Sequence, residues 1–322
     1  MGISKLKTQN SKLKTQIFDE AFLRRVERLN FRTVPSLRGV MVGERRSRHL
    51  RPALDFSDHR PYTPGDDLRH VDWHVYARSD ELFVKLGEAT QGIDVHLLLD
   101  ASPSMAWKPP WPTDPPVDKW RAVCRLAGAL AYLALSGGER VHLTPFAGQL
   151  AAGFGPTHGK RRAVAALRFL AELAVQPPAD ASGPDTLAQC LAGYARRHPG
   201  GGLLVLISDL FNAGQDAAAL SEGLRNLPPP RWQVVVMHFV SQQELAPTVD
   251  GDVELVDVET AEAGLFHLDE TTLSQYRLRV RRWLHQLEQT CARRGAAYAR
   301  VLAEWPFEQA VIPYLRQRGV VQ

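Results

Sequence analysis

The sequence has few cysteines and no long apolar run. Its three cysteines, Cys124, Cys190 and Cys291, lie far apart, and no two of them have the spacing of metal ligands. We therefore expect reduced thiols in the core rather than a disulfide framework. The longest apolar runs, such as Leu126–Leu135 and Val234–Val240, fall well short of the roughly 18 residues that predict a transmembrane helix. Because the N-terminus also lacks the apolar core of a signal peptide, the sequence predicts a cytoplasmic protein without a membrane span.

Excess charge and phosphate-binding motifs are also scarce. The 39 lysines and arginines exceed the 35 acidic residues by only four in 322 residues, so net charge gives weak support for nucleic-acid binding. No Gly-x4-Gly-Lys-Ser/Thr string occurs, so any nucleotide hydrolysis would have to come from a partner. Hydrophobic residues make up 44% of the chain, the usual fraction for a soluble globular protein.

The first 92 residues differ in character from the rest. Residues 1–17 carry a duplicated basic heptapeptide and are expected to be a disordered, solvated tail. Apolar residues at helical spacing predict one amphipathic helix over Phe18–Phe31. The following stretch is rich in Arg and Asp and predicts a loop and β segment, so we group residues 18–92 as one N-terminal region.

From residue 93 to 322, apolar strands alternate with amphipathic helices. This alternation predicts an α/β fold with a mostly parallel, doubly wound sheet and helices on both faces. A hairpin is expected as an insertion near residues 244–268. The predicted strands of the sheet are Asp94–Asp100, Val141–Phe146, Leu203–Ser208, Trp232–Val240 and Ala296–Leu302.

Oxygen-bearing side chains gather where two of these strands end. Asp100, Ser102 and Ser104 occupy alternate positions after the first strand, Thr186 opens a later helix, and Asp209 follows another strand. Parallel strands end at one edge of a sheet, which is where such folds bind ligands. Carboxylates and hydroxyls suit a hard divalent cation. An Asp-x-Ser-x-Ser string alone is more typical of a polar turn that caps a helix, so Thr186 and Asp209 carry the prediction of a site.

This ordered set resembles the metal-ion-dependent adhesion site of von Willebrand factor type A domains. The resemblance implies the sheet order 3-2-1-4-5-6 for residues 93–322. It also implies that Asp100, Ser102, Ser104, Thr186 and Asp209 surround Mg²⁺, with Mn²⁺ or Ca²⁺ as alternatives. A partner's carboxylate would then complete the coordination of the ion.

The segment before the first strand resembles a second signature. Residues 55–73, which include Pro64-Gly65-Asp66-Asp67 and Val71-Asp72-Trp73, look like the bacterial domain-of-unknown-function family 58. The later Ala77-Arg78 and Leu82–Lys85 extend the match. That family joins such a segment to a von Willebrand A-like domain and is often encoded beside MoxR-type AAA+ ATPases.

The two resemblances together imply a non-catalytic protein-protein interaction module. It would act as an adaptor or co-chaperone for a MoxR-type AAA+ ATPase and an unknown client. The Arg/Asp-rich segment is either a loop region held by its own ion pairs or a binding surface. In the second case the candidate partner-binding residues are Arg60, Tyr62, Asp66, Asp67, Arg69, Asp72, Trp73 and Arg78.

Two alternatives belong to other functional classes. The first is a metal-dependent hydrolase, in which His70 and His74 would share one face of a helix. The second is nucleic-acid binding through the Arg-rich residues 38–51, although a solvated or ion-paired loop is the simpler interpretation. The residues of the proposed hydrolase cluster are His59, His70, His74, Asp66, Asp67 and Asp72.

Overall fold

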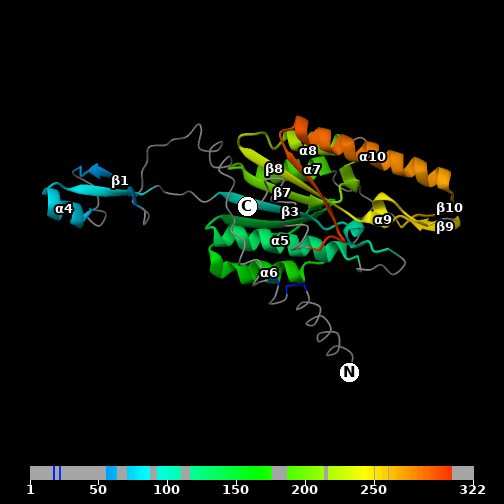
Figure 1. Ribbon diagram of the computed structural model, residues 1–322, viewed down its shortest axis with the longest axis horizontal. Helices are drawn as coiled ribbons and strands as arrows, with labels where there is room; N and C mark the ends of the chain where they lie inside the picture. Colours follow the sequence, from blue (N-terminus) through cyan, green and yellow to red (C-terminus); the bar gives the residue numbers. More distant parts are fainter. Residues whose placement is uncertain are drawn as a thin grey trace, which may run out of the picture. The chain divides into compact units, whose positions relative to one another are not determined.

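The computed structural model describes residues 17–18, 22, 56–63, 71–87, 93–109, 117–175, 187–213, 217–249, 251–259 and 261–306. The chain divides into two compact units, of which the smaller comprises residues 39–92. The two units are described separately below, and Figure 1 shows the elements of each.

A mostly parallel sheet forms the centre of the larger unit. Its strand order is β11-β8-β7-β3-β4, and both β5 and β6 pair antiparallel with β4. If β5 and β6 are counted together as the antiparallel edge beside β4, the sheet has the order 6-5-4-1-2-3. This is the predicted order 3-2-1-4-5-6 read from the other edge, so the predicted order is confirmed. The strands are β3 (Asp94–Asp100), β4 (Arg140–Ala147), β5 (Gln149–Leu150), β6 (Phe154–His158), β7 (Gly202–Ser208), β8 (Trp232–Val240) and β11 (Ala297–Leu302).

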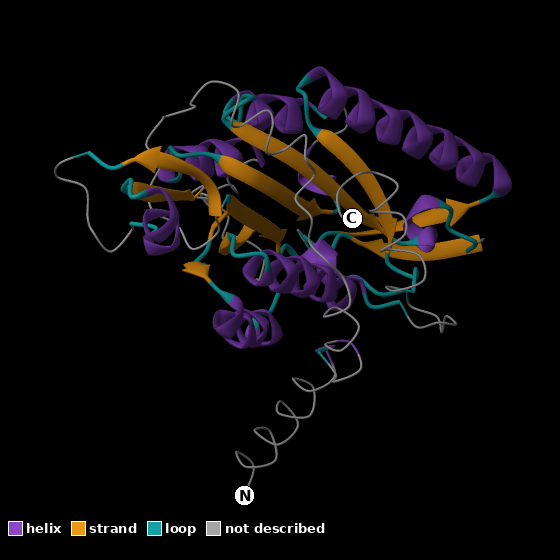
Figure 2. Cartoon of the chain, turned by 60° about the vertical axis from the view of Figure 1, so that its left-hand side comes forward, coloured by secondary structure: helices purple, strands orange, loops and turns teal. Residues whose placement is uncertain are grey.

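Helices cover both faces of this sheet, as Figures 1 and 2 show. Alternate residues of a strand point to opposite faces, so Leu97 and Leu99 enter one core cluster whereas Leu98 enters the other. On the first face lie α5 (Lys119–Ser136) and α6 (Ala163–Glu172). On the second face lie α7 (Leu187–Arg197), α8 (Ala218–Arg225) and α10 (Glu270–Arg293). Because both faces are covered, the central strands are apolar without interruption.

The start of the chain contributes to the core of the larger unit. Phe22 is buried, and Phe18 packs against the same cluster. The Arg125 guanidinium lies 5.5 Å from the Phe22 ring, and its Nε donates to the Ile17 carbonyl. A Cβ on Gly128 would press against the Phe18 ring, so glycine at this position lets the ring approach α5 closely. Our grouping of residues 18–92 as one region therefore differs from the structure, since packing on α5 separates Phe18 and Phe22 from residues 39–92.

The expected insertion is a two-stranded antiparallel hairpin between β8 and α10. It consists of β9 (Gly251–Val256) and β10 (Ala263–Leu268). Gly251 pairs with Leu268 and Val256 with Ala263, so the tip of the hairpin follows Val256. No residue of either strand is buried, and Figures 1 and 2 show the hairpin beyond the end of the large sheet.

The smaller unit contains a two-stranded sheet and one short helix. β1 (Phe56–Pro61) pairs antiparallel with β2 (Phe83–Gly87). Helix α4 (Trp73–Ser79) begins after Asp72, whose carboxylate accepts hydrogen bonds from the backbone N–H of His74 at 2.9 Å and of Val75 at 3.4 Å. Asp72 is therefore a helix N-cap.

The cysteines agree with the sequence analysis. Cys124, Cys190 and Cys291 are all buried and unpaired with one another. Burial raises the pKa of Cys124 and of Cys291 to about 12, so both are protonated thiols. None of the helices within the described residues is both long and apolar enough to span a bilayer.

Candidate metal centre

The candidate metal centre lies at the carboxyl ends of the neighbouring strands β3 and β7. Asp100 is the last residue of β3, and Asp209 follows the last residue of β7. Ser102 and Ser104 lie in the turn after β3, where η2 (Pro103–Ala106) begins. The exposed fractions are 0% for Asp100, 9% for Ser102, 5% for Ser104 and 1% for Asp209. These four residues thus lie at one edge of the sheet, as predicted from the sequence.

Asp100 accepts hydrogen bonds on both carboxylate oxygens. Oδ1 accepts from the Ser102 backbone N–H at 3.0 Å and from Ser102 Oγ at 2.6 Å. Oδ2 accepts from Ser208 Oγ, and from Asn212 Nδ2 at 3.2 Å. These four bonds match the approximately four acceptor sites of a carboxylate. Asp100 therefore fixes the turn and orients the hydroxyl of Ser102.

The two hydroxyls have the spacing of ligands to one ion. Ser102 Oγ lies 3.1 Å from Ser104 Oγ. An octahedral Mg²⁺ with oxygen ligands at about 2.1 Å separates adjacent ligands by about 3.0 Å. The donor set therefore fits a hard divalent cation bound by both hydroxyls, with the Asp100 carboxylate behind them.

Asp209 is paired with a buried lysine. Lys119 Nζ lies 3.0 Å from Asp209 Oδ2 and 2.7 Å from Glu244 Oε1. Glu244 is held in turn by a capping box with Ser241 at the start of α9 (Gln242–Leu245). Burial alone would lower the pKa of Lys119, but the two carboxylates outweigh burial and raise it. The ammonium is therefore charged, and it ties α5, β7 and α9 together beneath the site.

The surroundings of Asp100 disfavour its ionised form. Burial, followed by the nearby Asp209 carboxylate, raises the pKa of Asp100 to about 7. Its hydrogen-bond donors oppose this rise but do not cancel it. A cation at the adjacent hydroxyls would favour the ionised form of Asp100.

A second chain segment reaches the site from the hairpin. Glu259, at the hairpin tip, accepts a hydrogen bond on Oε1 from the Ser104 backbone N–H at 2.8 Å. The Glu259 N–H donates to Asp257 Oδ1 at 2.7 Å, and the Asp257 N–H donates to the Glu262 carbonyl at 2.8 Å. The tip is thus braced by its own hydrogen bonds and presents a carboxylate to the turn that carries Ser104.

Several of these residues were missed from the sequence. Ser208 and Asn212 flank the predicted Asp209, so polar residues around a strand end were the available signal. Lys119 and Glu259 gave no local signal, because their partners lie 90 and 155 residues away. The fifth predicted ligand, Thr186, lies outside the described residues.

Only some of the predicted residues of the smaller unit are among those that the structure describes. Asp72 is a helix cap rather than a free carboxylate, and α4 begins at Trp73, so the expected helix shared by His70 and His74 is wrong. Trp73 and Arg78 are exposed on α4, Tyr62 is half-buried, and Arg60 and His59 lie in β1. The remaining candidates Asp66, Asp67, Arg69 and His70, and the Arg-rich residues 38–51, lie outside the described residues.

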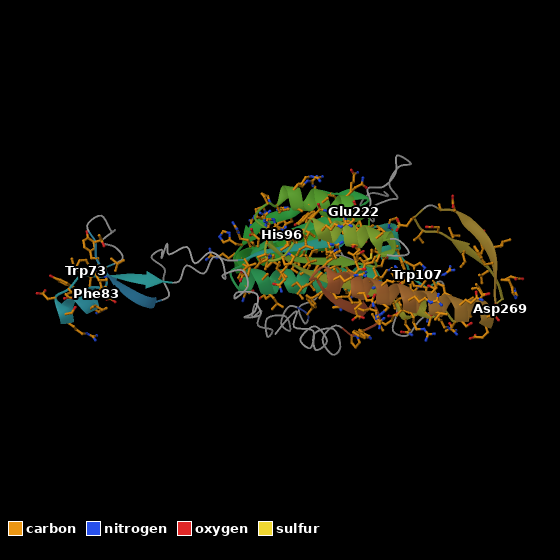
Figure 3. The ribbon with its side chains drawn as sticks, turned by 90° about the horizontal axis from the view of Figure 1, so that it is seen from above. Trp73, Phe83, His96, Trp107, Glu222 and Asp269 are labelled. Carbon is orange, nitrogen blue, oxygen red and sulfur yellow. The ribbon has the colours of Figure 1, made fainter. Side chains whose placement is uncertain are left out.

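Three histidines lie together at the opposite end of the large sheet. His96 and His142 occupy adjacent strands, and His198 follows α7, with one ring nitrogen of each within 4.8 Å of the others. Figure 3 labels His96 and Trp107 toward opposite ends of this unit. The rings of His96 and His142 stack with centroids 4.3 Å apart and planes 20° apart, so their in-plane lone pairs run nearly parallel. Both ring nitrogens of His96 are hydrogen-bonded, and burial lowers the pKa of His96 to about 3. We interpret the group as neutral, packed histidines.

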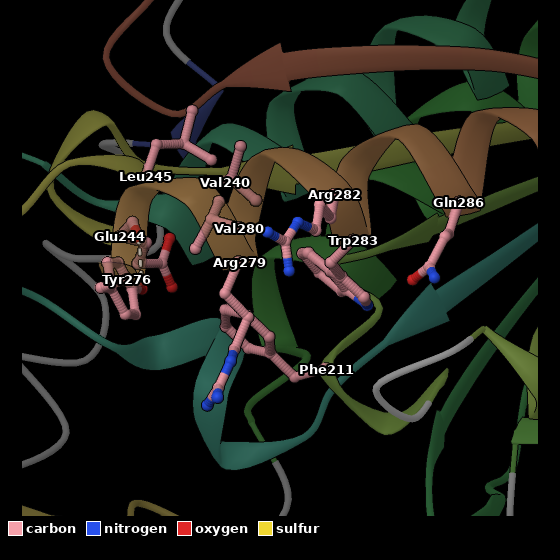
Figure 4. Close-up of a pocket in the computed structure, with 10 residues that line it drawn as sticks. All are labelled: Phe211, Val240, Glu244, Leu245, Tyr276, Arg279, Val280, Arg282, Trp283 and Gln286. Carbon is pink, nitrogen blue, oxygen red and sulfur yellow. Dashed lines mark hydrogen bonds between the residues drawn. The ribbon is translucent and has the colours of Figure 1, made fainter. Parts of the chain in front are cut away.

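A pocket of about 480 Å³ opens beside the metal centre. Phe211, which begins η4 (Phe211–Ala213), stacks on Trp283 of α10 with ring centroids 5.7 Å apart. Glu244 lies at one end of the pocket, and Arg279 and Arg282 line its α10 side (Figure 4). The pocket exists because the apolar stripe of α10 is only partly covered by the rest of the unit.

Comparisons with known proteins give relatives without an assigned function. A family model described as a protein of unknown function, DUF58, matches residues 58–285. Uncharacterized proteins of Mycobacterium tuberculosis and Mycobacterium bovis are each 25% identical over 259 residues, which is 80% of this chain and 78% of theirs.

Two solved structures are similar over 71% of this chain and 99% of their own. They are a conserved hypothetical protein BatB from Bacteroides thetaiotaomicron (15% identity, TM-score 0.38) and an aerotolerance-related membrane protein from Bacteroides fragilis (18% identity, TM-score 0.39).

Proposed function

Since the chain belongs to the DUF58 family of proteins of unknown function, we propose that it is a non-catalytic module that captures a partner protein through a metal ion. The ion binds Ser102 and Ser104, with Asp100 and Asp209 supplying negative charge beside them. When bound, the ion supplies a positive, oxygen-seeking centre to which a carboxylate of the partner attaches.

The observation that carries this proposal is the pair of neighbouring hydroxyls of Ser102 and Ser104, of which Asp100 orients the first. Their oxygens lie 3.1 Å apart just after β3, which is buried from Val95 to Asp100, so the protein holds them in place before any ion arrives. Because the proposed direct ligands are mostly uncharged, a bound ion would still bind an additional anionic oxygen favourably. That preference suits recognition of an Asp or Glu side chain.

The same groups argue against catalysis. Asp100 accepts four hydrogen bonds and is poorly placed to take a proton from a substrate. Asp209 is ion-paired with Lys119. The site therefore holds its carboxylates in fixed electrostatic roles.

The pocket beside the site suits the same partner segment. Phe211 and Trp283 offer apolar faces, whereas Arg279 and Arg282 offer positive charge. We propose that the segment presents one carboxylate to the ion and places an apolar side chain, flanked by acidic residues, in the pocket. The assignment of a MoxR-type AAA+ ATPase as the partner rests on the family resemblance alone.

A capture experiment tests this function. The full chain, immobilised, is exposed to an extract of its source organism with Mg²⁺ or with EDTA, and bound proteins are identified by mass spectrometry. We expect an AAA+ ATPase to be retained only with Mg²⁺ and to be lost with Ser104→Ala. The control is Ser274→Ala, which removes an exposed hydroxyl on α10. Capture that survives both EDTA and Ser104→Ala would contradict the proposal.

A further inference from the structure

The candidate metal centre is closed in this structure. Its four described residues are at most 9% exposed, whereas a site that receives a partner's carboxylate must be open. The hairpin tip lies over the turn that carries the two hydroxyls, because Glu259 is bonded to the Ser104 N–H. A partner therefore meets a position that a carboxylate of the same chain already borders.

We propose that Glu259 is an internal ligand of the metal centre, which takes the place of the partner's carboxylate until the partner displaces it. This inference rests on the function proposed above. Glu259 Oε1 lies 2.8 Å from the backbone nitrogen of Ser104, and Ser104 is one of the residues that hold the ion. The carboxylate thus borders the turn that would hold the ion, and its chemistry is that of the group the ion is proposed to capture.

The tip is built to present Glu259. The Asp257 carboxylate accepts from the Glu259 N–H at 2.7 Å, and the Ala261 N–H donates to the Asp257 carbonyl at 2.8 Å. Ala261 has a φ of +60°, a left-handed conformation that non-glycine residues rarely adopt. The tip thus holds a less favourable backbone while aiming one acidic side chain at the site.

The hairpin that carries Glu259 makes few stabilising contacts and can move away from the metal centre. No residue of β9 or β10 is buried, and the two strands pair only with each other within the described residues. Leu265 is 85% exposed and Phe266 is 52% exposed. Elements with few buried contacts open at low free-energy cost, so a partner's carboxylate can replace Glu259 without disturbing the sheet.

Binding of Mn²⁺ to the purified full chain tests the inference without the partner. Enhancement of water-proton relaxation reports how many water molecules the bound ion keeps. An internal carboxylate excludes one water, so we expect Glu259→Ala to bind Mn²⁺ about tenfold more weakly and to give a larger enhancement per bound ion. Acetate, as a simple carboxylate, should reduce that enhancement in Glu259→Ala and leave the wild type unchanged.

Two further variants separate a ligand from a merely structural contact. Glu259→Gln keeps an acceptor for the Ser104 N–H but loses the anionic oxygen, so it should behave like Glu259→Ala. Glu254→Ala removes an exposed carboxylate from β9 of the same hairpin and should behave like the wild type.

The outcomes distinguish this inference from the function on which it rests. If Glu259→Gln binds Mn²⁺ as the wild type does while Ser104→Ala binds it weakly, the internal ligand is refuted and the metal centre stands. If Ser104→Ala also binds Mn²⁺ normally, both proposals fail.

Discussion

Replacing Ser104 by Ala removes one proposed ligand and leaves the rest of the site in place. The variant loses the 3.1 Å contact with Ser102 Oγ, but the Ser104 backbone N–H still donates to Glu259. Loss of one such hydrogen bond lowers the free energy of unfolding by about 1 kcal/mol. The metal-free variant should therefore fold normally.

The larger effect appears when Mg²⁺ is added. At a concentration about 100 times its Kd, a bound ligand raises the free energy of unfolding by about 2.7 kcal/mol. Perturbing the shell of a metal site weakens binding by about 10–100-fold. At the same Mg²⁺ concentration, Ser104→Ala should then gain only about 0.4–1.4 kcal/mol.

Urea titrations of the wild type and of Ser104→Ala, each with and without Mg²⁺, measure both quantities. Ser274→Ala serves as the control, because its hydroxyl lies on the exposed side of α10, and it should gain as much from Mg²⁺ as the wild type. Equal stabilisation of wild type and Ser104→Ala by Mg²⁺, or no stabilisation of either, would refute the role of these hydroxyls.

Three further predictions concern the groups around and away from the site. Lys119→Ala leaves the buried Asp209 carboxylate and the half-buried Glu244 carboxylate without a cation and should lower the free energy of unfolding by about 3–5 kcal/mol. Lys108→Ala breaks an exposed pair and should lower it by less than about 1 kcal/mol. Equal effects of the two substitutions in urea titrations would contradict this. Asp100→Ala leaves four hydrogen-bond donors without their acceptor and should therefore lower Tm even without metal. An unchanged Tm would show that these hydrogen bonds do not stabilise the fold. Burial lowers the pKa of His96 and of His238 from 6.5 to about 3. Below pH 6.5 these histidines are therefore protonated in the unfolded chain but still neutral in the folded chain. The free energy of unfolding consequently decreases as the pH is lowered. At pH 5 each histidine should lower the free energy of unfolding by about 2 kcal/mol relative to pH 7.5. His96→Asn should remove the contribution of His96 to this pH dependence in urea titrations. An unchanged pH dependence would contradict the lowered pKa of His96.

Asp100→Ala is less suitable than Ser104→Ala as a variant that abolishes metal binding and keeps the fold intact. The structure shows a fully buried carboxylate with four donors, so this substitution perturbs folding as well. Ser104→Ala separates metal binding from folding better, because the Ser104 side chain makes fewer hydrogen bonds in the turn than Asp100 does.

The sheet and the strand-end residues could be predicted because their signals are local. An apolar run such as Val95–Leu99 predicts a covered strand, and helices between such runs force parallel pairing. Parallel pairing places Asp100 and Asp209 at one edge, so the order of elements sufficed to bring them together. The predicted strand Trp232–Val240 agrees with β8 at both ends.

The remaining features could not be predicted because they depend on contacts between distant segments. Lys119 looks like an ordinary first-turn residue of a helix, and only the folded structure places it between Asp209 and Glu244. Glu259 looks like one of several acidic residues in an exposed hairpin. Asp72 differs from these residues because its observed contacts are local: it lies directly before a short helix and caps it.

Crystals of the full chain grown with Mn²⁺ would test the central claim most directly, since anomalous scattering locates the ion. We expect a peak within about 2.2 Å of both Ser102 Oγ and Ser104 Oγ, with the Glu259 carboxylate as a further ligand of the ion. A peak only at His96, His142 and His198, or no peak beside the two serines at saturating Mn²⁺, would contradict the proposed metal centre.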